Sequence, residues 1–332
     1  MTVVRVAIFG VSHWHLDLYL PTLLAMDQVD IIGVSDPSAE VARRVGQQLG
    51  CAWSPSYAQL SADTRPEFVL ALGTHAEMFG EASHLLDHRI PFAMEKPCGL
   101  NAAEVRALAN RCERENAFAA VPFVWRHSEL LQEMRARFDP SAVDYLSLRW
   151  IAGPPTRYSD SGCDWMLDPA RSGGGCTVNL SVHLIDLTRV IFGEHSTRVA
   201  TAVMSNRAYG LPIEDYSLVV LRNGKRTALV ETGYLRPGRH SEFDMRFSIR
   251  ARDHYVIATG PEEMEVFAPD GRHERLRAHT TNVAHYPVFV RDVLRRLAAG
   301  EPPMASMTDM AEVMELVADT YTIAATTQGG SR

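Results

Sequence analysis

The sequence predicts an α/β protein of two domains, the first built on a parallel sheet and the second on a mostly antiparallel one. Short β-branched runs alternate with helical apolar patterns as far as about residue 122, and this alternation is typical of a parallel sheet with helices on its faces. Beyond about residue 198, strand-like runs follow one another directly. A length of 332 residues also suits two domains better than one.

The N-terminal elements follow from hydrophobic periodicity. The β-branched run at residues 3–9 ends at Gly10, helical spacing covers residues 16–26, and a second strand-like run covers residues 29–36, which together predict a βαβ unit. Asn101 is expected to cap a later helix, because its side chain can accept a hydrogen bond from a helix N-terminus. The remaining helices are expected at residues 38–49, 77–87 and 102–115, and the remaining strands at 68–72, 91–94 and 118–122.

The pattern changes near Phe123, so we expect one domain at residues 1–122 and another at residues 123–332. Turns at residues 222–225 and 269–271 separate strand-like runs, which indicates hairpins of a largely antiparallel sheet. In this second domain, helices are expected at residues 128–138, 182–192, 286–299 and 307–325, and strands at 145–151, 198–204, 217–221, 228–234, 243–251, 254–258 and 264–267.

Composition and charge narrow the class of protein. The 46% of apolar and 22% of charged residues are typical of a globular chain. A net charge of −7 leaves no excess of Lys and Arg for a phosphate backbone, so no nucleic acid is expected as partner. No stretch approaches a membrane span, and the opening apolar run is expected to be a strand and not a signal peptide. Five scattered cysteines without CxxC spacing predict reduced thiols in a cytoplasmic protein.

The turn after the first strand has the sequence Gly-Val-Ser-His-Trp-His at residues 10–15. Its position is that of the Rossmann glycine turn, where backbone N–H groups and a helix N-terminus receive a pyrophosphate. Ser12 and His15 stand where the second and third glycines of GxGxxG belong, so the motif alone is weak. Two histidines in a turn, with no nearby carboxylate or third ligand, do not predict a metal site. Cofactor contacts are expected from Gly10, Ser12, His13, Trp14 and His15.

Asp36 ends the second strand, 26 residues after Gly10. A carboxylate at this place suits hydrogen bonds from the adenosine ribose and repels a 2′-phosphate, which favours NAD over NADP. Arg43 and Arg44 lie nearby and leave NADP possible. The other interpretation of Asp36 is a turn residue before Pro37.

Glu95-Lys96-Pro97 follows the strand expected at residues 91–94. Open α/β sheets bind ligands at the carboxyl ends of their strands. Lys96 is therefore expected to orient a substrate hydroxyl or to assist its proton transfer. The other interpretation is a solvated surface lysine.

A second polar cluster lies near the helix expected at residues 182–192. Asn179 and His183 are four residues apart, and His183 and Asp186 are three apart, so a helix would place all three on one face. A histidine there can take a proton from an alcohol as hydride leaves. A helical histidine with a purely structural role is the alternative.

These features together resemble one family, the Gfo/Idh/MocA oxidoreductases, over nearly the whole chain. Glu95-Lys96-Pro97 matches the EKP motif of that family. The other matching segments are residues 165–169, the glycines at 173–175 with Asn179, His183 and Asp186, and a tail that includes Pro302, Pro303, Ser306, residues 309–311 and Tyr321. The resemblance implies a Rossmann domain, an α/β domain with an open sheet, nicotinamide at the cleft, and Lys96 and His183 as a catalytic pair.

The sequence also departs from the family pattern. Asn179 stands where many members have Asp, and Thr74-His75 stands where Thr-Pro is common. With the resemblance, Lys96, His183 and Asn179 are expected to be catalytic, and Thr74, His75, Glu95 and Lys96 join the expected cofactor contacts. Candidate substrate contacts, in loops or strand ends facing the cleft, are Trp125, Arg126, Tyr158, Asp164, Trp165 and Asp186.

The leading hypothesis is an NAD(P)-dependent dehydrogenase or reductase that moves a hydride between nicotinamide and a sugar, polyol or related hydroxy or keto compound. The altered glycine turn motivates an alternative, a catalytically silent ligand-sensing regulatory protein of the same fold. A third possibility, implied by the resemblance alone, is an NAD-dependent enzyme that cleaves glycosides. The resemblance also implies a homo-dimer or homo-tetramer that assembles through the C-terminal sheet.

Overall fold

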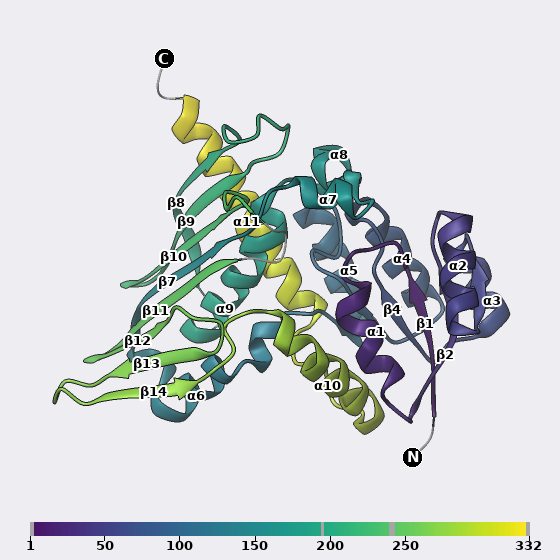
Figure 1. Cartoon of the computed structure of the whole chain (residues 1–332), viewed down its shortest axis with the longest axis horizontal. Coiled ribbons are helices and arrows are strands. Elements are labelled where there is room, and N and C mark those ends of the chain that lie inside the picture. The colour runs from purple at the N-terminus through teal and green to yellow at the C-terminus, as the bar shows by residue number, and fades with distance from the viewer. Residues whose placement is uncertain (1–2, 194–195, 239–242, 330–332) are drawn as a thin grey trace.

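The computed structural model describes residues 3–193, 196–238 and 243–329. It contains two sheets, each packed against helices, and it confirms the expected α/β class with a parallel N-terminal sheet and a mostly antiparallel C-terminal one (Figure 1). Among the helices in these ranges, none combines the length and the apolar character that crossing a membrane requires.

The six strands of the N-terminal sheet are all parallel and lie in the order β3-β2-β1-β4-β5-β6. The order reverses between β1 and β4, and such a reversal point is where open α/β sheets bind ligands. The strands are β1 Val4–Phe9, β2 Val29–Ser35, β3 Ala52–Ser54, β4 Phe68–Ala71, β5 Phe92–Met94 and β6 Ala119–Ala120.

A helix follows each of the first five strands. Ser38 caps α2 and Asn101 caps α5, because each side chain accepts a hydrogen bond from a main-chain N–H three residues later. Sequence periodicity does not predict β3 or α3, because β3 is three residues long and α3 buries only Leu60 and Ser61. The helices are α1 Leu16–Leu24, α2 Ala39–Leu49, α3 Tyr57–Thr64, α4 His75–Asp87 and α5 Ala102–Glu115.

The second sheet has eight strands in the order β14-β13-β12-β11-β7-β10-β9-β8, and β7 with β10 is its one parallel pair. Sequence periodicity does not predict β14, because its residues are mostly charged and exposed and show no apolar alternation. The strands are β7 Val143–Ile151, β8 Arg198–Ser205, β9 Tyr216–Asn223, β10 Arg226–Gly233, β11 Asp244–Ala251, β12 His254–Ala258, β13 Glu263–Phe267 and β14 His273–Arg277.

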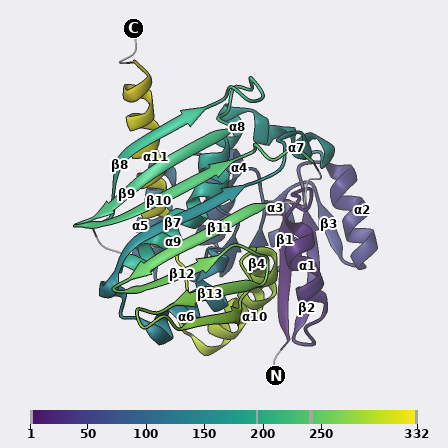
Figure 2. The same ribbon diagram turned by 60° about the vertical axis from the view of Figure 1, so that its left-hand side comes forward.

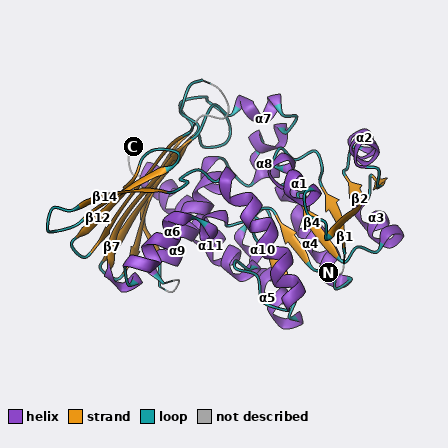
Figure 3. Ribbon diagram, turned by 60° about the horizontal axis from the view of Figure 1, so that its bottom comes forward, coloured by secondary structure: helices purple, strands orange, loops and turns teal. Residues whose placement is uncertain are grey.

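Helices cover one face of this sheet, and within the described ranges none lies over the other face (Figures 2 and 3). Helix α11 packs against β8 and α9 and also against α5, and α10 packs against α1. The expected division after Pro122 therefore separates the two sheets, while the C-terminal helices return to the first domain. These helices are α6 Glu129–Arg137, α7 Thr156–Asp160, α8 Pro169–Ser172, α9 Val182–Phe192, α10 Tyr286–Ala299 and α11 Met307–Gly329.

Candidate active site

Lys96 follows β5 at the carboxyl edge of the N-terminal sheet, and only 2% of its surface is exposed. Its Nζ donates hydrogen bonds to the main-chain oxygen of Asn179 at 3.0 Å and to Oδ1 of the same residue at 2.5 Å. Because Asn179 lies beyond the first domain, this contact joins the two domains. The interpretation of Lys96 as a solvated surface lysine is wrong.

Asn179 lies in a π-helical turn, Thr177–Ser181, that leads into α9. The glycines before this turn allow the chain to approach its neighbours closely, since a Cβ added at Gly175 would lie 2.1 Å from a facing main-chain oxygen. Asn179 Oδ1 accepts from Lys96, and its Nδ2 lies 2.5 Å from the hydroxyl of Tyr158, to which it donates. The amide therefore orients the ammonium and the phenol at the same time.

His183 lies in the first turn of α9, and 2% of its surface is exposed. The centroid of its ring is 5.3 Å from that of Trp125 and 5.8 Å from that of Trp150. Its Nδ1 is buried and has no hydrogen-bond partner in the part of the chain that the structure describes. Burial, followed by the positive charge of Lys96, holds the pKa of His183 well below its usual value. The imidazole is therefore neutral at pH 7 and can accept a proton.

The pKa of Lys96 lies close to neutral pH. Burial lowers the pKa of Lys96 to about 8, and the nearby guanidinium of Arg157 lowers it as well, whereas the Glu95 carboxylate acts in the opposite direction. Such an amine is still mostly an ammonium at pH 7, yet it can exchange a proton at little cost.

Glu95 connects the lysine segment to the first turn of the protein. Its buried carboxylate accepts hydrogen bonds from Nδ1 of His15 at 2.9 Å and from the hydroxyl of Tyr19. Burial acts to raise the pKa of Glu95, but the charges of His15 and Lys96 and the bond from His15 outweigh it and lower the pKa. The carboxylate therefore fixes the orientation of the His15 ring.

Lys96, Asn179 and His183 all line one cavity of about 540 Å³ between the domains. The cavity brings together Lys96 and His183, which are 87 residues apart in the sequence, and Asn179 is hydrogen-bonded to Lys96 there. The lining residues are Trp14, His15, Asp17, Leu18, Lys96, Trp150, Arg157, Tyr158, Ser161, Asn179, Leu180, His183, Phe243, Asn282 and Val283.

Gly10 and Asp36 shape the neighbouring edge of the sheet. Gly10 has a φ of +71°, and an added Cβ would lie 2.6 Å from the main chain of Leu72, so only glycine fits. Asp36 is buried and accepts hydrogen bonds from the main-chain N–H groups of Ser12 at 2.7 Å and Ser38 at 3.0 Å. A carboxylate offers about four lone pairs, so these bonds leave room for ribose hydroxyls. Both interpretations of Asp36 are compatible with this geometry.

Aromatic side chains from both domains cover the rest of the turn. His13 stacks on Trp14 with ring centroids 4.0 Å apart, and both rings contact Trp165. His75, directly after the α4 capping residue Thr74, also packs against Trp165, and its Nδ1 lies 2.7 Å from a main-chain oxygen of α8. Trp165, which the sequence suggests as a substrate contact, thus lies beside the glycine turn and not in the wall of the cavity.

Three further candidates for substrate contact are placed elsewhere by the structure. Arg126 and Asp186 form a buried ion pair with distances of 2.7 and 3.0 Å, and Arg126 also binds Asp309 at 2.8 Å. Asp164 is exposed and does not line the cavity. Spacing along a helix does not reveal that Asp186 is already paired with Arg126, and position in a loop does not reveal that Asp164 is exposed at the surface.

Trp125 lies behind His183 without lining the cavity, so Tyr158 is the one expected substrate contact among its lining residues. Sequence reasoning missed Arg157 and Asn282, which also line it. Arg157 directly precedes Tyr158, and this adjacency was an available signal. Asn282 lies outside any recognised motif.

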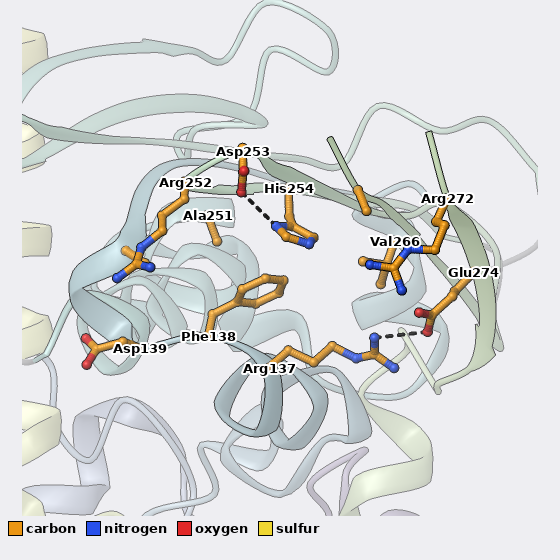
Figure 4. Close-up of a pocket in the computed structure, with 12 residues that line it drawn as sticks. Arg137, Phe138, Asp139, Ala251, Arg252, Asp253, His254, Val266, Arg272 and Glu274 are labelled. Carbon is orange, nitrogen blue, oxygen red and sulfur yellow. Dashed lines mark hydrogen bonds and ion pairs between the residues drawn. The ribbon is translucent and has the colours of Figure 1, made fainter. Parts of the chain in front are cut away.

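A second cavity of about 480 Å³ lies between the end of α6 and the strands β11 to β14 (Figure 4). Much of its charge is paired internally, since Arg137 lies 3.0 Å from Glu274 and His254 lies 3.0 Å from Asp253. None of the expected site residues is among its lining residues. The cavity that contains Lys96 is therefore the candidate active site.

Comparison with protein families agrees with this geometry. Residues 4–123 match the model described as an oxidoreductase family with an NAD-binding Rossmann fold, and residues 146–255 match the Gfo/Idh/MocA C-terminal domain. The chain belongs to the Gfo/Idh/MocA family of oxidoreductases, and its first domain is an NAD-binding Rossmann domain.

Individual relatives are distant. The chain is 23% identical over 177 residues to scyllo-inositol 2-dehydrogenase (NAD(+)) of Bacillus subtilis, an alignment that covers 51% of this chain and 48% of that protein. The chain spans about half the length of the curated relatives it matches.

Solved structures match over more of the chain. A levoglucosan dehydrogenase in complex with NADH and levoglucosan has a TM-score of 0.86 at 14% identity, with 98% of each chain covered. GenD2 from gentamicin A biosynthesis, in complex with NAD, has a TM-score of 0.82 at 19% identity, with 98% of this chain and 95% of that chain covered. At these identities the likeness shows a shared fold.

Proposed function

We propose that this protein is an NAD-dependent dehydrogenase that oxidises an alcohol of a sugar or polyol, or reduces the corresponding ketone. The observation that carries the proposal is the convergence of a buried lysine and a neutral histidine, Lys96 and His183, on one cavity at the ligand-binding edge of a Rossmann sheet. Proton transfer at a carbinol oxygen needs a base and a hydrogen-bond donor at one place, and this pair supplies both.

The residues at the sheet edge fit a dinucleotide. Gly10 forms the tight turn, we expect Ser12 to contact the pyrophosphate and Asp36 the ribose of such a cofactor, and Thr74 begins the helix after β4. His13, Trp14, His75 and Glu95 complete the set that we expect on the cofactor side, because their rings and the Glu95 carboxylate lie around this turn. When bound, nicotinamide accepts or supplies the hydride.

Side chains of the protein act on the proton and the oxygen of the substrate hydroxyl. The imidazole of His183 accepts the proton of the substrate hydroxyl, because it is neutral and lines the cavity. The ammonium of Lys96 donates a hydrogen bond to the same oxygen and favours the developing negative charge. Asn179 holds Lys96 in place and has no proton to exchange, so its part is orientation.

Assembly and location form part of the same proposal. The uncovered face of the second sheet carries partly exposed apolar side chains such as Leu218, Val220 and Val203, the last with 47% of its surface exposed. A second copy of the sheet would bury them, which favours a homo-dimer or homo-tetramer through this face. All five cysteines are free, which suits the cytoplasm.

A titration with NAD and NADP, followed by a screen of sugars and polyols for nicotinamide absorbance, tests the proposal. We expect NAD to bind and at least one sugar or polyol to change the absorbance of the bound nicotinamide. Tight sugar binding with no such change would favour the ligand-sensing alternative. Release of a sugar from a glycoside without net cofactor reduction would favour glycoside cleavage.

A further inference from the structure

We infer that the substrate carries an anionic group, a carboxylate or a phosphate, and that Arg157 binds it. The observation is a guanidinium in the wall of the candidate active site, where no carboxylate of the described residues pairs with it. The inference deepens the proposed function, on which it rests for the identity of the cavity.

Arg157 stands on α7 and is held by aromatic side chains. Its guanidinium carbon lies 4.8 Å from the ring centroid of Tyr158 and 5.1 Å from that of Tyr234, and its Nη2 donates a hydrogen bond of 2.7 Å to the Tyr158 hydroxyl. These contacts fix the direction of the side chain. They leave most of its five N–H donors without a protein acceptor in the part of the chain that is described.

Arg157 lines a cavity whose lining residues carry a net excess of positive charge. Lys96 lines the same cavity, and the one carboxylate among the lining residues, Asp17, is exposed and forms no ion pair with Arg157. By contrast, the buried Arg126 elsewhere in the protein is paired with Asp186 and Asp309. The guanidinium of Arg157 is half-buried in the cavity wall and has no carboxylate partner among the described residues, so an anionic group of the ligand can supply its counter-charge.

A short chain of hydrogen bonds places this charge next to the reacting centre. Lys96 donates to Asn179, Asn179 donates to Tyr158, and Tyr158 also accepts from Arg157. The two cations are therefore separated by two side chains, and the charge of Arg157 lowers the pKa of Lys96 in addition to the effect of burial. An anion bound at Arg157 offsets this repulsion and favours the charged form of Lys96.

The test uses the full chain saturated with NAD and two matched sets of ligands. One set is D-glucose, D-glucuronate and D-glucose 6-phosphate, and the other is the corresponding D-galactose series. Isothermal titration calorimetry measures binding, and nicotinamide absorbance is followed in parallel. We expect a uronate or a sugar phosphate to bind at least about tenfold more tightly than its neutral parent, which is the scale of a charge-assisted hydrogen bond, and the two acidic arms identify which anion is preferred.

Variants distinguish recognition of charge from a structural role of Arg157. Arg157→Gln should lower the affinity for the preferred anion by about tenfold or more and the affinity for the neutral parent much less, so that the preference for the anion is lost, and Arg157→Lys should retain part of the preference. Arg135→Gln, at an exposed position on α6, is the matched control and should change neither.

Three results would overturn the inference. They are binding of no acidic ligand, equal affinity for neutral and acidic ligands, and an equal loss of both affinities in Arg157→Gln and Arg157→Lys. The proposed function is judged separately, because acidic ligands that bind without changing nicotinamide absorbance would contradict the dehydrogenase and leave Arg157 as an anion site. Oxidation of neutral sugars alone would contradict the anion site and leave the dehydrogenase.

Discussion

Two neighbouring regions of one sheet edge are built in different ways. Around Lys96, side chains from both domains position one another through hydrogen bonds, as in the contact from Lys96 to Asn179. Around Gly10, the main chain sets the geometry, and a single carboxylate, Asp36, receives the N–H of Ser12. We propose proton transfer for the first region and cofactor binding through the backbone for the second.

The comparison also explains the altered glycine turn. His15 replaces the third glycine of the motif, and its ring binds the carboxylate of Glu95, whose other oxygen accepts from the main-chain N–H of Lys96. The turn and the lysine segment are therefore one hydrogen-bonded unit. The residue at this glycine position of the motif thus connects the turn to the segment of the proposed catalytic lysine.

The largest expected effect is a loss of kcat without a loss of affinity for NAD. Lys96→Met or His183→Ala should lower kcat by about 10²–10⁴-fold, because each removes a group that acts on the proton in flight. The Kd for NAD should remain nearly unchanged. Steady-state kinetics with the sugar or polyol found in the screen, and an NAD titration, measure both quantities.

The chain offers a matched control for the lysine. Lys225, the only other lysine, is exposed in the turn between β9 and β10, and Lys225→Met should leave kcat and the Kd for NAD unaltered. Full activity in Lys96→Met or His183→Ala would remove the proposed roles of these residues.

A smaller loss of kcat is expected when the hydrogen bonds of Asn179, one of which joins the two domains, are removed. Asn179→Ala removes the acceptor for Lys96 Nζ and the donor to Tyr158. We expect kcat to fall by about 10- to 100-fold, since a hydrogen bond to a charged group is lost but no proton-transferring group is. A loss as large as that in Lys96→Met, measured in the same assay, would show that Asn179 does more than orient.

A substitution in the glycine turn is expected to weaken cofactor binding more than it lowers kcat. Gly10→Ala places a methyl group against the main chain of Leu72 at a positive φ, so we expect the Kd for NAD to rise about tenfold and Tm to fall, at a strain of about 1–3 kcal/mol. The kcat at saturating NAD should change much less. Gly50→Ala is the control, because Gly50 also has a positive φ but nothing lies within 4 Å of an added Cβ. Equal effects of the two substitutions on the Kd for NAD would contradict a specific role of the tight turn.

The smallest effect concerns cofactor choice. A carboxylate beside the ribose repels a 2′-phosphate, so Asp36→Ala should raise the affinity for NADP relative to NAD by about fivefold to tenfold. Parallel fluorescence titrations with the two cofactors give the ratio, and Asp63→Ala on α3 serves as a control. A wild-type protein that already prefers NADP would show that Asp36 functions as a turn residue.

Much of the fold follows from sequence periodicity. Helices such as Ala102–Glu115 and Tyr286–Ala299 are predicted at their observed bounds, because an apolar stripe coincides with the capping residue Asn101 in the first and with the terminal Gly300 in the second. Elements without an apolar pattern are missed, as with β14, whose side chains are largely exposed. The parallel pairing of β7 with β10 is a long-range contact that no local pattern contains.

The sequence predicts a site residue only where a motif also shows the position of that residue in the fold. Lys96 and His183 stand at a strand end and in a helical turn, and both reach the cavity. Arg126 and Asp186 appear equally suitable in the sequence, yet they pair with each other across 60 residues. Such pairing depends on the packing of distant elements, so local spacing cannot reveal it.

The pH dependence of kcat/KM at saturating NAD tests the central claim, that a charged Lys96 and a neutral His183 act together, most directly. Lys96 has a pKa of about 8, and its ammonium is lost above that value, so kcat/KM should fall as the pH rises through about 8. The pKa of His183 lies well below its usual value, so no corresponding loss is expected between pH 7 and pH 6. Lys96→Arg, which stays charged, should retain measurable activity without the alkaline fall. A rate that increases through pH 8, or an alkaline fall that persists in Lys96→Arg, would contradict the account.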